Sequence, residues 1–81
     1  MISKTVTLST TPQTLKALLG CQEQHVSSLI IQAPSTNAAT AYLNGIFELP
    51  KDSTFPIVGP INLSEFTVRG TTNDTLNIIA M

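Results

Sequence analysis

The chain has 81 residues, and its four Lys and Arg against five Asp and Glu give a formal net charge of -1. Charged residues are only 11% of the chain, against roughly 25% in an ordinary soluble domain; the few basic residues are scattered, which argues against nucleic-acid binding. A hydrophobic share of 42% argues against disorder. Neither a membrane-spanning run nor a secretory signal is expected, so the protein is expected to be made inside a cell. The length of residues 1–81 predicts one domain.

The first residues predict a strand. Ile2, Val6 and Leu8 alternate with Ser and Thr residues, and this period of two is typical of a half-buried strand.

A short helix is expected next. Thr11 is predicted to cap it, Pro12 to be its first residue and Gly20 to follow its C-terminal end. A helix of about eight residues is too short to stand alone. It is expected to pack on a sheet through one face, formed by Leu15, Leu18 and Leu19.

The middle of the chain predicts three strands. Residues 26–33 contain three consecutive large aliphatic residues at 29–31, so both faces of that strand are expected to be covered. Residues 39–43 form the next predicted strand. Asn44-Gly45 then predicts a type I′ hairpin turn that leads into residues 46–49.

The C-terminal third predicts short strands separated by prolines. Pro50, Pro56 and Pro60 are expected to break the chain into short extended pieces and to confine them to sheet edges or loops. Residues 66–69 alternate cleanly as a strand, and a turn is expected over residues 70–74.

The last strand, residues 75–81, is apolar on both faces. Leu76, Ile78 and Ala80 share one face, and Ile79 and Met81 lie on the other with an asparagine. An unguarded edge of this kind is an aggregation hazard, so the strand lies between other strands or its outer face meets another subunit. In total the pattern predicts an all-β protein, a compact antiparallel β-sandwich or small barrel of six to seven strands with one short helix near the N-terminus.

Catalytic chemistry is not expected. Cys21 and His25 are the only nucleophile and base close in sequence, and a small hydrolase that uses them lacks an orienting third group. The carboxylates show neither acid/base pairing nor a calcium-loop spacing, and no phosphate-binding loop is present. We therefore expect a protein that is not an enzyme and that binds no cofactor and no metal. The dispersed aromatic residues are expected in the core rather than on a stacking platform; they are Tyr42, Phe47, Phe55 and Phe66.

Oligomerisation is the expected source of additional stability. A chain of this size buries only a thin core, and small domains often add disulfides, a metal or further subunits. A single cysteine excludes an internal disulfide and makes a cysteine-based zinc site untenable. The residues expected nearest a subunit or capsid contact are Ile2, Val6, Ile79 and Met81.

A series of short motifs follows one order along nearly the whole chain. The Thr-Pro-x-x-Leu helix is followed by SLIIQAPSTN at 28–37, AYLNG at 41–45 and FTVRGT at 66–71, with Asp74, Leu76 and Ile78 closing the series. In this order the chain resembles small virion proteins of tailed bacteriophages.

The resemblance implies a β-sandwich that coats a capsid as a decoration (cement) protein or lies at the base of a head fibre. Its partner would be the major capsid protein, and it would act as a trimer or dimer on the virion surface, after synthesis in the host cytoplasm. The short length favours decoration, because no sequence remains to build a fibre stalk. The alternative is a host-surface or glycan binding module of a fibre or tail, and the resemblance transfers no catalytic residues.

Overall fold

Eight strands and two short helices make up the computed structural model, which describes residues 2–20, 22 and 25–81. In chain order they are β1 (Ile2–Thr7), β2 (Gln13–Thr14), α1 (Leu15–Leu19), β3 (His25–Ala33), β4 (Ala41–Leu43), β5 (Phe47–Leu49), β6 (Ser53–Asn62), the 3-10 helix η1 (Leu63–Glu65), β7 (Thr67–Arg69) and β8 (Thr75–Ala80).

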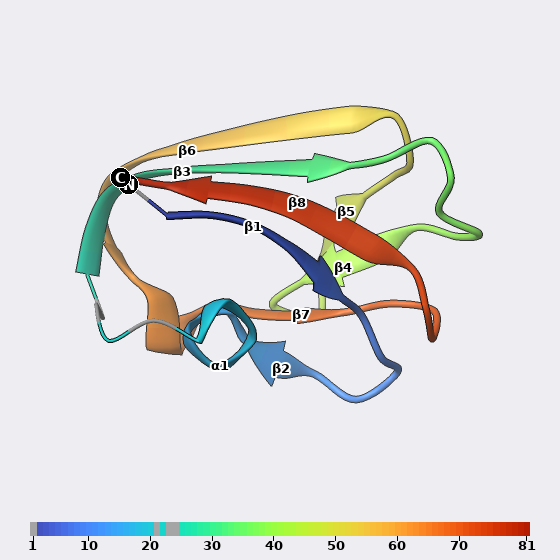
Figure 1. The fold of residues 1–81 in the computed structure, drawn as a ribbon. Helices are drawn as coiled ribbons and strands as arrows, with labels where there is room; N and C mark the ends of the chain where they lie inside the picture. Colours follow the sequence, from blue (N-terminus) through green and yellow to red (C-terminus); the bar gives the residue numbers. More distant parts are fainter. Residues whose placement is uncertain (1, 21, 23–24) are drawn as a thin grey trace.

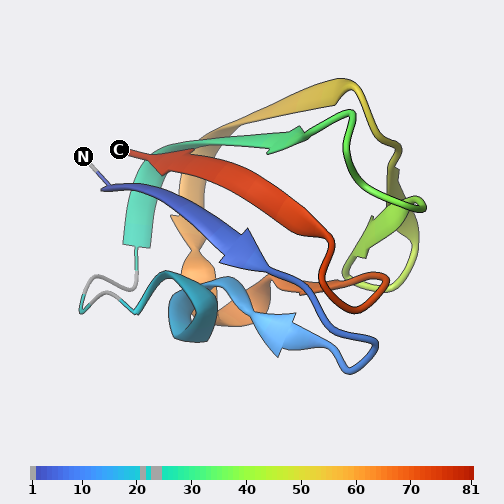
Figure 2. The same ribbon diagram turned by 45° about the vertical axis from the view of Figure 1, so that its right-hand side comes forward.

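The strands form two antiparallel sheets of four strands each, with the orders β1-β8-β3-β6 and β2-β7-β4-β5. One sheet lies above the other in Figure 1, and the turned view in Figure 2 shows the same two layers with α1 beside β2. The all-β prediction is confirmed. The predicted count of six to seven strands is wrong, because the two-residue strand β2 lies where only a helix was predicted.

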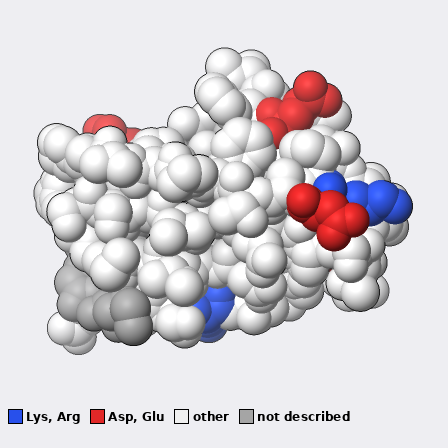
Figure 3. Space-filling view, turned by 90° about the horizontal axis from the view of Figure 1, so that it is seen from above, with Lys and Arg blue, Asp and Glu red and all other residues white. Residues whose placement is uncertain are grey.

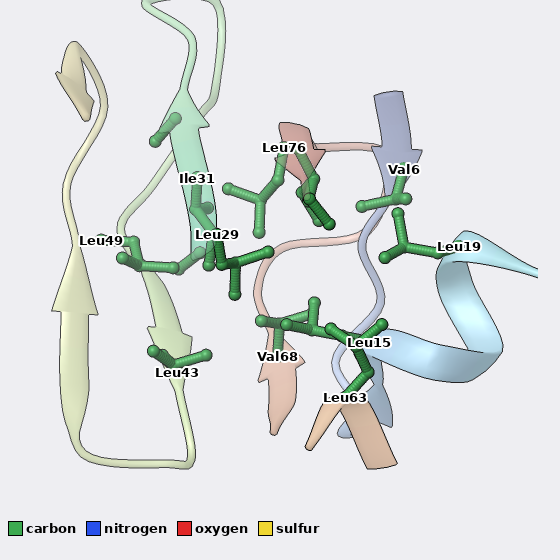
Figure 4. Close-up of a cluster of buried hydrophobic side chains, with 14 of the residues drawn as sticks. Val6, Leu15, Leu19, Leu29, Ile31, Leu43, Leu49, Leu63, Val68 and Leu76 are labelled. Carbon is green, nitrogen blue, oxygen red and sulfur yellow. The ribbon is translucent and has the colours of Figure 1, made fainter. Parts of the chain in front are cut away.

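The hydrophobic core fills the space between the two sheets (Figure 4). Leu29 and Ile31 from β3 and Leu76 from β8 point into it from one sheet, and Val68 from β7 enters from the other. Leu15 of α1 is also fully buried, so the helix closes one side of the core. These side chains hold the layers together through the burial of apolar surface.

The final strand follows its predicted alternation. Leu76, Ile78 and Ala80 are buried, whereas Ile79 is exposed on the other face. β8 pairs with β1 along its whole length, from Ile2 opposite Ala80 to Thr7 opposite Thr75, and with β3 on its other side. Both edges of β8 are therefore paired, which is the predicted arrangement in which the last strand lies between other strands.

The helix begins later than predicted. Residues 13–14 pair with β7 as strand β2, so the chain becomes helical only at Leu15. Thr14, not Thr11, is the N-cap, and its hydroxyl accepts the N–H of Ala17 at 3.2 Å. Pro12 lies outside the helix. Gly20 does end it, in the left-handed conformation with φ 63°. No helix among the described residues is long and apolar enough to cross a membrane.

Pro50 lies between β5 and β6, as predicted, but the other two prolines do not break the chain. Pro56 and Pro60 both lie within β6, a single strand of ten residues, so the prediction of short separate pieces is wrong. β6 is an edge strand of its sheet, as the prolines require, because an edge strand needs hydrogen bonds on one side only. Its pairing with β3 shifts register between Val26 and Ser28, whose partners are Ile61 and Val58, and Gly59, between these partners, has a φ of 117°.

The β4–β5 hairpin is confirmed. Asn44 and Gly45 have φ values of 54° and 77°, and these positive values are what a type I′ turn needs. The N–H of Ile46 donates to the carbonyl of Leu43 at 3.3 Å. The predicted strand at 39–43 is shorter than expected, since β4 begins at Ala41.

Candidate interaction surfaces

The outer face of the β1-β8-β3-β6 sheet carries no Lys, Arg, Asp or Glu side chain, and His25 lies at its border beside Val58, Pro60 and Met81. We define this outer face by its outward-pointing residues: Ser3, Thr5, Thr7, Ser28, Ile30, Gln32, Thr54, Pro56, Val58, Pro60, Thr75, Asn77, Ile79 and Met81. In Figure 3 the centre of the view from above is free of acidic and basic residues, which lie towards its margins. The solvent face of an antiparallel sheet is ordinarily polar and charged, so this face differs from a simple solvated surface.

One half of the outer face is a row of small polar side chains bonded to each other. The Thr5 hydroxyl donates to the Asn77 side-chain oxygen at 2.7 Å, and the Asn77 amide donates to the Gln32 side-chain oxygen at 2.9 Å. Thr54 lies opposite Gln32 on β6 and continues the row. The Thr5 hydroxyl and the Asn77 amide therefore each have a partner within the sheet.

The other half of the outer face is apolar. Ile30 and Ile79 lie side by side on β3 and β8. Ile79 is 37% exposed, Met81 53% and Val58 86%. Ile30 is only half-buried whereas Leu29 and Ile31 are fully buried, so the chain covers one face of β3 completely and the other in part.

A shallow hollow of about 560 Å³ lies where the two halves meet, between Thr5, Ile30 and Ile79. Lys4 is the charged residue that borders it. Its ammonium group is engaged, because it donates to the Leu18 carbonyl at the end of α1 at 3.1 Å. A basic residue at the C-terminal end of a helix is favourable for the helix dipole, so Lys4 serves the fold at this position.

The four residues predicted nearest a contact do not lie on one surface. Ile79 and Met81 are exposed on the outer face. Ile2 is half-buried and packs against the core. Val6 is only 3% exposed and points into the core, so its side chain is not available for a contact.

Three of the four aromatic residues gather at a groove that the sequence did not predict. Phe47 lies edge-on to Phe55 with ring centres 6.2 Å apart, and Phe47 is 58% exposed, so it does not belong to the core. The β4–β5 hairpin meets β6 here and leaves a space of about 430 Å³. This phenylalanine groove is lined by Leu43, Asn44, Ile46, Phe47, Phe55, Pro56, Ile57 and Phe66.

The chemistry of the phenylalanine groove is apolar. Its lining contains one polar side chain, Asn44, whose side-chain oxygen accepts the N–H of Thr67 at 2.8 Å. Ile46 at the tip of the hairpin is 83% exposed. Tyr42 lies apart from the groove, with the guanidinium of Arg69 4.6 Å from its ring centre.

A buried polar cluster ties two loops together. The Asp74 carboxylate accepts the N–H groups of Ala38 and Ala39 at 2.8 and 3.1 Å. Asn37 donates to the Thr75 carbonyl and accepts the N–H of Thr75, both at 2.9 Å. Asp74 and Asn37 are 7% and 4% exposed, so the cluster is structural and offers no open site.

The predicted nucleophile and base are not brought into a site that can be described. Cys21 lies outside the described residues. His25 is exposed at the start of β3, opposite Asn62. Over residues 2–20, 22 and 25–81, no group of three His, Cys, Asp or Glu residues could hold a metal ion.

Most of the sheet edges are poorly suited to pairing with another chain. Pro56 and Pro60 remove N–H donors from β6, and the opposite-sheet edges β2 and β5 are only two and three residues long. Short edges and prolines both discourage edge-to-edge pairing. β1, the remaining edge, is six residues long and has no proline, so it stays a candidate contact surface together with the sheet faces.

Comparison of the chain with protein-family models, curated proteins and solved structures finds no match. Fold and surfaces define a small all-β protein of two antiparallel layers with an uncharged outer face and an apolar groove.

Proposed function

We propose that this chain is a structural virion protein: a decoration protein that, as an oligomer, binds the outer surface of a tailed-phage capsid and stabilises the capsid. The order of motifs from SLIIQAPSTN to FTVRGT supports the virion class. The observation that carries a contact role is the uncharged outer face, because an interface must lose water and charged side chains resist that loss.

The mechanism of the proposed function is multivalent binding. A small oligomer that contacts several major capsid subunits at once gains affinity without any single strong contact. The chain then needs neither a catalytic group nor a cofactor, and it would lie on the capsid surface after synthesis in the host cytoplasm.

The test is binding to empty shells built from the major capsid protein of the same genome. We expect the chain to sediment with the shells in hundreds of copies and to raise the temperature at which they rupture. Ile79→Lys on the outer face is expected to weaken this binding, whereas Glu65→Lys, at an exposed position on η1, serves as the control for a changed charge elsewhere. Shells that neither retain the protein nor gain heat resistance contradict the proposal.

The phenylalanine groove favours a second candidate, a host-surface or glycan binding module. Ligand sites are concave and lined mainly by apolar and aromatic side chains, and the groove presents Phe47 and Phe55 to solvent. This candidate predicts binding to host cells or to immobilised glycans. Phe47→Ala is expected to remove that binding and Val58→Ala, outside the groove, to leave it unchanged. If the chain binds neither host cells nor glycans, the result supports the capsid role and contradicts this second candidate.

A further inference from the structure

The tip of the β4–β5 hairpin carries the groups for a reaction of the chain with itself. A backbone nitrogen that follows an asparagine can attack the carbonyl carbon of that side chain, and both groups belong to the same molecule. Glycine favours the attack because it has no Cβ to hinder the approach. Asn44 is the one asparagine of the chain that glycine follows, at Gly45.

The reaction converts the Asn44 side-chain amide first into a ring and then into a carboxylate. The Gly45 nitrogen forms a bond to Asn44 Cγ and loses its proton, the bond between Cγ and Nδ2 breaks, and ammonia leaves with that proton. The product is a five-membered succinimide. Water then adds to one of its carbonyl carbons and opens the ring, which gives aspartate or isoaspartate at position 44. Water is the only co-reactant, and nothing is oxidised or reduced.

Both reacting residues are open to solvent. Asn44 and Gly45 are exposed, and a Cβ built on Gly45 would meet no atom within 4 Å. Over residues 2–20, 22 and 25–81, no hydrogen bond engages the Gly45 N–H. Water can therefore reach the succinimide, and the described part of the chain leaves the attacking nitrogen unoccupied.

The hairpin turn nevertheless holds the reacting atoms apart. Asn44 and Gly45 have φ values of 54° and 77°, and the first central residue of a type I′ turn has a ψ of about +30°. Cβ stands about 120° from the backbone nitrogen on a tetrahedral Cα, so this ψ places Gly45 N about 150° from Asn44 Cβ around the Cα–C bond. A five-membered ring needs these two atoms nearly eclipsed. The turn must therefore open before the ring can close.

Two hydrogen bonds to Thr67 resist this opening. The Asn44 N–H donates to the Thr67 carbonyl at 2.7 Å, and the Thr67 N–H donates to Asn44 Oδ1 at 2.8 Å. The second bond also holds the side chain whose Cγ would have to turn towards the Gly45 nitrogen. Each bond shifts the equilibrium against opening by a factor of roughly 2–10.

We infer that Asn44 is a deamidation site that the folded hairpin protects, so that the reaction proceeds only from molecules whose turn has opened. The inference goes beyond the proposed function and does not depend on it. Aspartate at position 44 would bring a negative charge to the phenylalanine groove, in which Asn44 is the one polar side chain. Isoaspartate would add a main-chain atom between Leu43 and Phe47, which lie opposite each other in the hairpin.

The experiment compares the folded chain with the same chain in denaturant, both incubated in mildly alkaline buffer. Mass spectrometry of peptides from each sample locates the small mass increase that accompanies loss of ammonia, and chromatography separates aspartate from isoaspartate. In denaturant we expect Asn44 to react before the other asparagines. In the folded chain we expect the reaction of Asn44 to be at least about tenfold slower, because two hydrogen bonds hold the turn closed.

Thr67→Pro tests the bond to the side chain. This substitution removes the N–H that holds Asn44 Oδ1, at the first residue of β7, where proline is tolerated. Phe66 before it is already extended, with φ -100° and ψ 126°, as a residue before proline must be. The folded variant is expected to react roughly 2–10 times faster than the original chain. Thr67→Val keeps the N–H and is the matched control, with the rate of the original chain.

Far-UV circular dichroism establishes that each variant is folded. Equal rates for the folded and the denatured original chain overturn the protection, and this comparison stands even where Thr67→Pro does not fold. Earlier reaction of another asparagine in denaturant overturns the assignment of the site. A folded Thr67→Pro variant that reacts as slowly as Thr67→Val overturns the role of the Thr67 bond.

Discussion

Asp74, in the turn before β8, is expected to contribute more to the free energy of folding than a single loop residue usually does. Its carboxylate accepts two backbone N–H groups, from Ala38 and Ala39, and it is only 7% exposed. Asp74→Ala removes both acceptors and releases the loop before β4 from the turn before β8.

The magnitude follows from the two hydrogen bonds. A hydrogen bond to a charged group contributes about 1.5–3 kcal/mol, but Ala38 and Ala39 are themselves exposed, so water can reach their N–H groups in the variant. We therefore expect a total loss of about 2–3 kcal/mol. A chain of 81 residues has a free energy of unfolding of about 4–12 kcal/mol, so the loss is a substantial share of it.

The assay is urea unfolding followed by far-UV circular dichroism, together with the thermal midpoint. The midpoint of Asp74→Ala is expected to fall by roughly 8–24 °C. Asp74→Asn keeps one acceptor oxygen and should lie between the two. Glu48→Ala, which removes an exposed carboxylate from β5, should stay within about 0.5 kcal/mol of the original chain. Equal stability of Asp74→Ala and Glu48→Ala would refute the reasoning.

Three further substitutions test the packing. Leu29→Ala, at a fully buried position, should cost about 2–5 kcal/mol, whereas Ile46→Ala, 83% exposed, should cost under about 0.5 kcal/mol; similar melting shifts would contradict the assigned core. A Cβ at Gly70 would lie 2.8 Å from Leu8 Cδ1, so Gly70→Ala should cost about 1–3 kcal/mol, and adding Leu8→Val should give a less than additive loss in a double-mutant cycle. Pro56→Val restores an N–H donor on the edge strand β6 and should increase aggregation on heating, measured by light scattering; unchanged scattering would show that Pro56 does not guard the edge.

Local patterns in the sequence predicted β8 and the β4–β5 hairpin correctly, because both depend on the geometry of residues that are neighbours in the chain. The alternation of Leu76, Ile78 and Ala80 with outward-facing residues predicts β8, because side chains of a strand point to opposite faces in turn. Asn44-Gly45 predicts the hairpin, because only a few residues adopt positive φ without strain.

The start of the helix depends on a partner that is distant in sequence. Thr11 and Pro12 have the chemistry of a helix start, but Gln13 and Thr14 pair with Val68 and Thr67 on β7. That pairing holds the chain extended for two more residues, and Thr14 then takes the role of cap. Tertiary contacts override local preference here, as they often do.

The sequence by itself therefore determined the all-β class, the inward and outward faces of the long strands and the shortage of charge, since each follows from residue type and spacing. Only the tertiary structure decided that β6 runs unbroken through Pro56, because the place of a strand at a sheet edge depends on its neighbours. It also decided that Phe47 meets Phe55, since β5 and β6 come together only in the folded chain. The uncharged outer face belongs to both levels: the residues are uncharged in the sequence, but pairing of four separate strands collects them on one surface.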